Sequence, residues 1–363
     1  MIYLNNAAST YPKPPVMISA MTEALRREPL SSLRSTLSSE RPIEDLLRSE
    51  LAELLHCTHS ENIHFTSGAT DALNRLIGGL TPMRVALTSD NHNSVLRPVY
   101  NNEGIKEHVL LDDPFELEHL SGIDWLILPH CSNVTGHIHS IAETCWMAHN
   151  KGTKVMVDAA QSLGTEPFEV DKWNVDAVAF TGHKALFGPQ GTGGYYIRPG
   201  IRLRPTQYGG TGRDSNIVEY GEKDWEYEVG THNGPGLAGM AAGVKYVLDR
   251  GVEAISASLR SETNWLIGEL SQLPKVSCYS KLGDNQGPVV SFNIHGLQPS
   301  DVGYILQNTY GITVRTGLHC APFCHRKLGT QPFGTVRISL SIFNTHDELE
   351  QLINSLLEII AAV

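Results

Sequence analysis

The sequence predicts an α/β protein organised around a mainly parallel β-sheet. Two apolar runs, within residues 154–161 (KVMVDAAQ) and 177–180 (AVAF), have the length and unbroken hydrophobicity of strands that are buried on both faces. They lie about one strand–crossover–strand unit apart, and a predicted helix at 141–150 leads into the first. Because ligands gather where parallel strands end, the polar residues after both runs are expected to face one crevice.

The composition is that of a globular protein with a large core. The chain has 363 residues, of which 41% are hydrophobic and 18% charged, and this length favours two domains. A formal net charge of -11 argues against a general nucleic-acid-binding protein, which needs a basic face. Neither a signal-peptide pattern nor an apolar run of membrane-spanning length is found, so no membrane partner and a cytoplasmic location are expected. Six scattered cysteines do not indicate a disulfide scaffold, and most are expected to be small buried hydrophobic residues.

The first part of the chain is predicted to alternate helices with strands. Hydrophobic periodicity and the positions of proline and glycine give the boundaries. In chain order we expect an extended piece and a Pro-punctuated loop at 1–14, a flexible polar loop at 31–41, a helix at 42–56, a strand at 63–66, a helix from 69, a strand at 83–88, a strand pattern at 125–133, the 141–150 helix and the two runs above.

The second part predicts a smaller α+β domain. A Gly-rich polar loop at 209–233 precedes predicted helices at 236–250 and 252–273, strands at 287–294, 312–316 and 335–341, and a closing helix. That helix starts at Thr345, where T-H-D-E has the spacing of a capping box. We therefore divide the chain into an N-terminal arm (1–14), a large domain (15–240) and a small C-terminal domain (241–363).

Lys184 is the first candidate for chemistry. It follows the 177–180 run and stands among apolar and glycine residues, with no acid nearby in sequence. Desolvation in such a setting disfavours the ammonium form and suits a Schiff-base nucleophile. The alternative is a lysine with a buried stem whose amine only caps the strand.

Asp158, at the end of the neighbouring run, gives the lysine a partner. An aspartate beside a Schiff-base lysine is what pyridoxal 5'-phosphate (PLP) needs, because the acid keeps the pyridine nitrogen protonated and the ring an electron sink. A helix N-cap is the alternative role for Asp158.

Residues 62–80 predict an anion site. A strand breaks at Ser67-Gly68, and the helix that follows presents free N–H groups and its positive dipole end, to which Thr70 could add a hydroxyl. Taken alone, the segment also fits a plain strand-to-helix turn with Thr70 as its cap.

The segments VDAAQ (157–161) and FTGHK (180–184) resemble the cofactor core of the class V aminotransferase superfamily, specifically its cysteine desulfurase and selenocysteine lyase branch. The resemblance extends from Tyr3 to about Asn344. It implies the PLP-dependent transferase fold type I, with a mainly parallel seven-stranded sheet in the large domain and a smaller α+β domain. It also implies an N-terminal arm over the active site, which Asn6-Ala7-Ala8 would begin.

The resemblance implies a set of cofactor contacts. It places a phosphate site at Ala69, Thr70, Thr181 and His183, and a stacking, proton-moving histidine at His92. Asn91 stands where the family commonly has an acid. Contacts to the cofactor's phenolic oxygen are implied at Asn133 and Gln161, and Asn133 would also bind the substrate carboxylate. The pyridine contact is implied at Asp158 and the covalent link at Lys184. Thr231, in the sequence GTHN (230–233), would bind the phosphate in the neighbouring subunit, so the resemblance implies a homodimer; a surface loop is the alternative for this segment.

The segment RTGLHCAPFCH (315–325) indicates which of the PLP-dependent reactions the protein would catalyse. Cys320 follows a predicted strand, with His319 beside it and Arg315 nearby, and such cations favour the thiolate. The segment resembles the family's R-x-G-x-H-C-A form, in which this cysteine takes sulfur from L-cysteine as a persulfide and alanine is released. Lys184 would act as the base, His92 would assist, and Arg337 would hold the substrate carboxylate in a bidentate pair.

Several alternatives stay open for this segment and for the function. His319, Cys320, Cys324 and His325 could form a metal site, although no second ligand pair accompanies them, and we predict no metal. Cys320 could also be an inert loop cysteine, and Cys324 could resolve a persulfide on Cys320. The function could be desulfuration of L-cysteine, with selenocysteine as another substrate and a protein as the sulfur acceptor. It could instead be another PLP lyase, transaminase or epimerase that does not use Cys320, or a non-catalytic sulfur carrier or assembly partner.

Overall fold

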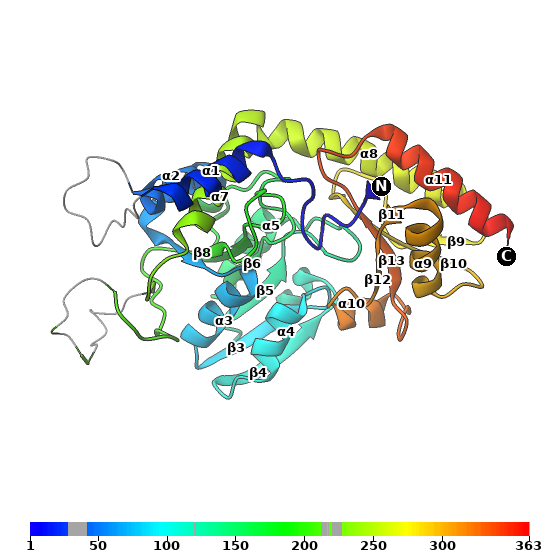
Figure 1. Cartoon of the computed structure of the whole chain (residues 1–363). Coiled ribbons are helices and arrows are strands. Elements are labelled where there is room, and N and C mark those ends of the chain that lie inside the picture. The colour runs from blue at the N-terminus through cyan, green and yellow to red at the C-terminus, as the bar shows by residue number, and fades with distance from the viewer. Residues whose placement is uncertain (28–41, 120, 212–215, 217, 220–226, 363) are drawn as a thin grey trace.

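The fold was examined in a computed structural model that describes residues 1–27, 42–119, 121–211, 216, 218–219 and 227–362. The flexible loop predicted at 31–41 lies outside the described residues, as does part of the predicted loop at 209–233. Two layered units share the chain, one around a seven-stranded sheet and one around a four-stranded sheet (Figure 1).

The larger sheet is mainly parallel, as the sequence predicts. Its strand order is β2(Ile63–Thr66), β8(Gly193–Ile197), β7(Ala177–Thr181), β6(Lys154–Asp158), β5(Trp125–Pro129), β3(Met83–Thr88) and β4(Ile105–Leu111). Only β8 breaks the pattern, because it runs antiparallel to both β7 and β2. Strands β4 and β8 are not among the sequence predictions, and the strand expected over 125–133 ends at Pro129.

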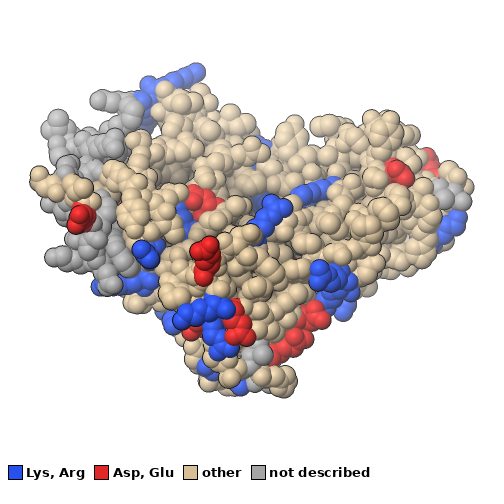
Figure 2. Space-filling view, turned by 90° about the horizontal axis from the view of Figure 1, so that it is seen from below, with Lys and Arg blue, Asp and Glu red and all other residues tan. Residues whose placement is uncertain are grey.

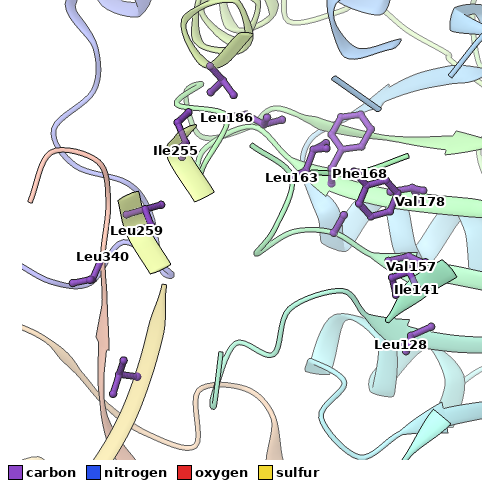
Figure 3. Close-up of a cluster of buried hydrophobic side chains, with 14 of the residues drawn as sticks. Leu128, Ile141, Val157, Leu163, Phe168, Val178, Leu186, Ile255, Leu259 and Leu340 are labelled. Carbon is purple, nitrogen blue, oxygen red and sulfur yellow. The ribbon is translucent and has the colours of Figure 1, made fainter. Parts of the chain in front are cut away.

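Helices cover both faces of this sheet, which explains why its strands are apolar throughout. On one face lie α1(Pro15–Arg26), α2(Ile43–Leu55), α5(Ile141–Asn150), the short α6(Val170–Trp173) and α7(Gly234–Arg250); on the other lie α3(Ala69–Gly79) and α4(Asn93–Tyr100). Neighbouring strand residues serve opposite faces: Val157 belongs to the core under α2 and α5, whereas Met156 belongs to the core under α3 and α4. Figure 3 shows the first core, in which Val157 and Val178 of the sheet lie near Ile141 and Phe168.

The smaller sheet is antiparallel, in the order β12(Arg315–Gly317), β13(Thr335–Ser339), β10(Val289–Ile294) and β9(Val276–Cys278). It is accompanied by α8(Val252–Gln272), α9(Pro299–Tyr310), α10(Pro322–Lys327) and α11(His346–Ala361). The strand predicted over 312–316 is split into β11(Ile312–Thr313) and β12, and the strand predicted over 335–341 ends at Ser339. The predicted capping box is confirmed: the Thr345 hydroxyl accepts from the Glu348 N–H, and the Glu348 carboxylate accepts from the Thr345 N–H.

The N-terminal arm of the chain docks on the small C-terminal unit. The N-terminal strand β1(Ile2–Tyr3) pairs with β11 in parallel, and the Asn6 amide donates to the carbonyl of Ser339 at 3.0 Å. The residues that follow β1 then run from the small sheet to the larger one.

Two 3-10 turns, η1(Ser60–Asn62) and η2(Pro114–His119), complete the elements of the described residues.

Surface charge on the face seen in Figure 2 is mixed. Lysine and arginine side chains are interspersed with aspartate and glutamate, and no broad basic area is visible among the described residues of that face. Within the described part of the chain, no helix has both the length and the apolar character that crossing a bilayer requires.

Candidate active site

A cavity of about 410 Å³ lies at the carboxyl ends of β5, β6 and β7, where residues of both sheets meet. Most of the residues proposed from the sequence line it, and they come from segments far apart in the chain. They are Ala69, Thr70, His92, Asn133, Asp158, Gln161, Thr181, His183, Lys184 and Arg337. Cys320 and Thr231 do not line this cavity. Thr231 is exposed on the surface of the chain.

Lys184 and Asp158 come together because β6 and β7 are parallel neighbours. Asp158 is paired in register with Ala179, and Lys184 lies three residues beyond the end of β7. Burial lowers the pKa of Lys184 to about 8, against a smaller opposing effect of the Asp158 carboxylate. The pKa of Asp158 is raised by burial, while the Ala160 N–H, which donates to its Oδ1 at 2.9 Å, and the Lys184 charge oppose this rise. Desolvation therefore acts on the lysine as the sequence predicts.

The turn between β2 and α3 forms the polar end of the cavity. Gly68 has φ 150°, a conformation that other residues rarely adopt, and it brings the start of α3 to the cavity wall beside Thr181. Nearby, the buried Nδ1 of His183 has no hydrogen-bond partner in the described structure. Free N–H groups at a helix start and an unpaired ring nitrogen fit a phosphate group.

His92 is held in one tautomer. It caps α4, and its Nδ1 accepts from the Ser94 N–H at 3.0 Å while the Ser94 hydroxyl lies 2.8 Å away. Burial, helped by the Lys184 charge, lowers the pKa of His92 to about 3. The ring is therefore neutral and carries its proton on Nε2. Asn91, which occupies the place of the family's acid, is buried and donates to the carbonyl of Ile127 at 2.8 Å, so its role is structural.

Arg337 is fully buried on β13 and reaches the cavity from the smaller sheet. Its Nη1 donates to the carbonyl of Asn133 at 2.9 Å, but its Nε is buried without a partner. Burial lowers the pKa of Arg337 to about 9, so the guanidinium remains charged at neutral pH. An unpaired donor on a buried cation fits a carboxylate ligand.

Cys320 sits in a tight loop between β12 and α10. His319 and Cys320 both have positive φ, 48° and 61°, which is uncommon for residues other than glycine. Three contacts hold the loop: Asn133 donates to the carbonyl of His319 at 2.6 Å, the Asn93 N–H donates to the carbonyl of Cys320 at 2.7 Å, and Arg315 Nη2 donates to Cys320 Sγ at 3.4 Å.

The structure corrects the role expected for His319. Its ring is buried with Nε2 3.1 Å from the carbonyl of Thr335, and burial lowers its pKa to about 2. His319 is therefore neutral and cannot favour a thiolate by its charge. Of the two neighbours named from the sequence, only Arg315 supplies a cation to Cys320.

Three donors of the N-terminal arm meet on one carbonyl beside Lys184. The carbonyl of His183 accepts from the Thr10 N–H at 3.1 Å, the Ser9 hydroxyl at 3.3 Å and Lys13 Nζ at 2.7 Å. Sequence reasoning missed Lys13, because a lysine in a Pro-punctuated loop carries no pattern that distinguishes it from a solvated one.

The other cysteines differ in position. Cys131 is buried and lines the cavity, and Cys324 is buried against Val134 and Leu328. All six cysteines are unpaired. The described residues contain no group of three or more His, Cys, Asp or Glu side chains arranged to hold a metal ion.

The residues that line the cavity fit PLP. The helix start at α3 and the unpaired Nδ1 of His183 suit its phosphate, and Lys184 lies within reach of Asp158 as a lysine–aspartate pair. Arg337 leaves a donor for the carboxylate of an amino acid bound beside the cofactor.

Comparison with known proteins agrees with this geometry. The model of the family described as aminotransferase class-V matches residues 2–352. A protein of Methanothermobacter thermautotrophicus named "Probable cysteine desulfurase" is 32% identical, with 100% of this chain and 95% of the relative covered. A cysteine desulfurase of Enterobacter sp. (strain 638) is 29% identical over 98% of this chain and 92% of the relative. Among solved structures, the apo cysteine desulfurase from Thermococcus onnurineus NA1 superposes with a TM-score of 0.86 at 28% identity, covering 100% of this chain and 95% of that one.

Proposed function

The chain belongs to the aminotransferase class-V family, and from this premise we propose that it is a PLP-dependent cysteine desulfurase that converts L-cysteine to L-alanine. The observation that carries the proposal is the convergence of Lys184, Asp158 and Arg337 on one cavity, with the Cys320 sulfur held by Arg315 at its edge. Selenocysteine, whose selenium would take the place of the substrate sulfur, is a second substrate under the same proposal.

Each side chain has a place in holding the cofactor. Ala69, Thr70, Thr181 and His183 would hold its phosphate, Asp158 its pyridine nitrogen, Asn133 and Gln161 its phenolic oxygen, and His92 would stack on its ring. When bound through Lys184, PLP supplies an electron sink that acidifies the α-carbon of the amino-acid substrate.

The chain's own residues then carry the proton and the sulfur. Arg337 binds the substrate carboxylate with its free donor, and the amine of Lys184, which is neutral above about pH 8, accepts the α-proton. Cys320 attacks the substrate sulfur as a thiolate: the Sγ–S bond forms and the substrate Cβ–S bond breaks. Its electron pair stays with Cβ, which takes up a proton to become the methyl group of alanine, and Cys320 is left as a persulfide. Arg315 donates a hydrogen bond to this sulfur. His92 assists as a hydrogen-bond donor through its Nε2–H, because its Nδ1 already accepts from the Ser94 N–H.

We further propose that the active protein is a homodimer. Thr231 is exposed and lies outside the cavity of its own chain, as expected for a residue that completes the site of a second copy. Six unpaired thiols suit a reducing compartment, and we propose the cytoplasm.

The test is alanine and sulfide production from L-cysteine by the PLP-loaded protein and its Cys320→Ala variant. We expect the parent to release alanine, and the variant to lose this activity while it keeps the visible absorbance of the bound cofactor. If both proteins release alanine equally, the enzyme is a PLP lyase that does not need Cys320. If neither protein binds PLP, a sulfur-carrier role replaces the enzymatic one.

A further inference from the structure

A second cavity, larger than the first, lies outside the cofactor site. We call it the outer groove; its volume is about 710 Å³, and α3, α4 and the Cys320 loop form its walls. Its lining includes Asn74, Asn93, Arg97, Asn101, Glu103 and Cys320. A volume of this size is typical of sites for small molecules.

Cys320 belongs to this groove and not to the cofactor cavity. The two cavities share Thr70, His92 and Ser94 as a common wall, and Arg315, which donates to Cys320 Sγ, lines the inner one. The sulfur therefore stands between two approaches. A substrate bound at Arg337 approaches it from the cofactor cavity, and a second reactant can approach it from the outer groove.

Among the described residues that line the groove, Arg97 is a cation without an ion pair. Arg97 is exposed on α4, and within the described part of the chain its guanidinium has neither an ion pair nor a side-chain hydrogen bond. It lies close enough to His92 for its charge to act on that ring. Apart from Glu103, the other polar side chains of the groove are neutral. A fork of free N–H donors in the same groove as a reactive sulfur matches a carboxylate on the incoming reactant.

We propose that the outer groove is the binding site of a low-molecular-weight thiol that bears a carboxylate and takes the sulfur from Cys320. This inference rests on the proposed function, because that function supplies the persulfide. The carboxylate pairs with Arg97, and the acceptor's thiolate attacks the outer sulfur of the persulfide. One S–S bond forms as the other breaks, the Cys320 thiolate leaves, and the acceptor departs as a persulfide, with no external oxidant or reductant.

The first test needs no turnover. The rate at which Cys320 is alkylated is measured with iodoacetate, an anion, and with iodoacetamide, its neutral counterpart, in the parent and in Arg97→Gln, Arg97→Lys and Arg26→Gln. We expect Arg97→Gln to lower the iodoacetate rate roughly two- to five-fold, because the variant loses one partly screened positive charge that attracts the anion. The iodoacetamide rate should not change, because that reagent is neutral. Arg97→Lys should retain the parent rates, as should Arg26→Gln, a control on exposed α1. Equal changes with both reagents, or no change, would overturn the role of Arg97.

The second test measures sulfur discharge. The Cys320 persulfide, formed in one turnover, is mixed with 3-mercaptopropionate or with neutral 2-mercaptoethanol. We expect the parent to prefer the anionic thiol, and Arg97→Gln to lose that preference by the same factor. If only a protein thiol discharges the persulfide, the groove belongs to a protein acceptor. If the discharge rate falls for both small thiols as the protein concentration rises, the groove is covered by a second copy of the chain. Either result overturns the proposal. If no persulfide forms, the proposed function fails, whereas the alkylation result still decides the charge of the groove.

Discussion

The lowered pKa of Lys184 makes its reactivity with the cofactor depend on pH in a predictable way. A fall of the pKa from the usual 10.5 to about 8 raises the neutral fraction of the amine at neutral pH from about 0.03% to about 9%, or about 300-fold. Only the neutral amine attacks an aldehyde. The cofactor-free protein should therefore capture PLP with a rate that rises with pH and levels off above about 8.

A second part of this prediction concerns the Asp158 carboxylate. Its carboxylate raises the pKa of Lys184 against the larger effect of burial, so Asp158→Asn should move the midpoint of the pH profile below about 8. In the assay, cofactor-free protein is mixed with PLP over roughly pH 6 to 10 and quenched with borohydride, and the modified Lys184 peptide is quantified by mass spectrometry. N-acetyl-lysine amide, run in parallel, corrects for the titration of PLP itself.

Two results would refute this account of the site. A midpoint near 10.5 would mean that Lys184 is well solvated in the free protein. An upward movement in Asp158→Asn would mean that the carboxylate does not act on the lysine through its charge.

Three further predictions concern other contacts of the chain. Hydrogen bonds to Glu228 and Glu44 raise the pKa of His232 to about 9. The stability that the protonated His232 contributes is therefore complete below about pH 6.5 and is lost as pH rises through about 9. Over this range the melting temperature of His232→Gln should fall less than that of the parent. Lys13→Met removes a charge-assisted hydrogen bond worth about 1.5–3 kcal/mol from the arm, so limited proteolysis should cut the arm faster, while Lys13→Arg should restore protection. Thr345→Ala should cost about 1 kcal/mol and about 2 °C in melting temperature, and Thr345→Ser should recover most of the loss.

Each of these predictions has a result that contradicts it. Parallel pH profiles for the parent and the His232 variant would exclude that histidine as the titrating group. Unchanged cleavage of the arm in the Lys13→Met variant would show that the backbone and the Ser9 contact suffice to hold it. Equal melting temperatures for the Thr345 variants would mean that packing of α11, rather than its cap, fixes the start of that helix.

The strands of the large sheet could be predicted where both of their faces are covered, because such strands are continuously apolar. The 154–161 and 177–180 runs therefore located β6 and β7, together with the cavity at their ends. Two strands escaped prediction. β4 (IKEHVLL) lies at the sheet edge with much of its surface exposed, and β8 (GGYYI) begins with two glycines after a Gly-rich loop.

The sequence also led to a wrong expectation for the charge of His319 in the cysteine loop. His319 is next to Cys320 in the chain, but its ring turns into the protein toward Thr335, where desolvation keeps it neutral. The side-chain direction that decides this follows from the left-handed backbone at both residues, which only the folded chain reveals. The Lys13 contact and the outer groove likewise depend on segments that meet only in three dimensions.

The docking of the N-terminal arm on the small C-terminal unit has a consequence for synthesis on the ribosome. Asn6 bonds to Ser339, 333 residues further along, and the arm that follows it carries the donors that fix the carbonyl before Lys184. At about 5–20 residues per second, the ribosome needs roughly 20 to 70 s to make the strand on which that arm docks. Between the synthesis of Lys184 and that of Ser339, 155 residues later, the nascent protein therefore has its lysine and aspartate without the docked arm that closes over them. The last strand of the small sheet, rather than the cofactor-binding half, sets the earliest moment at which the site can be complete.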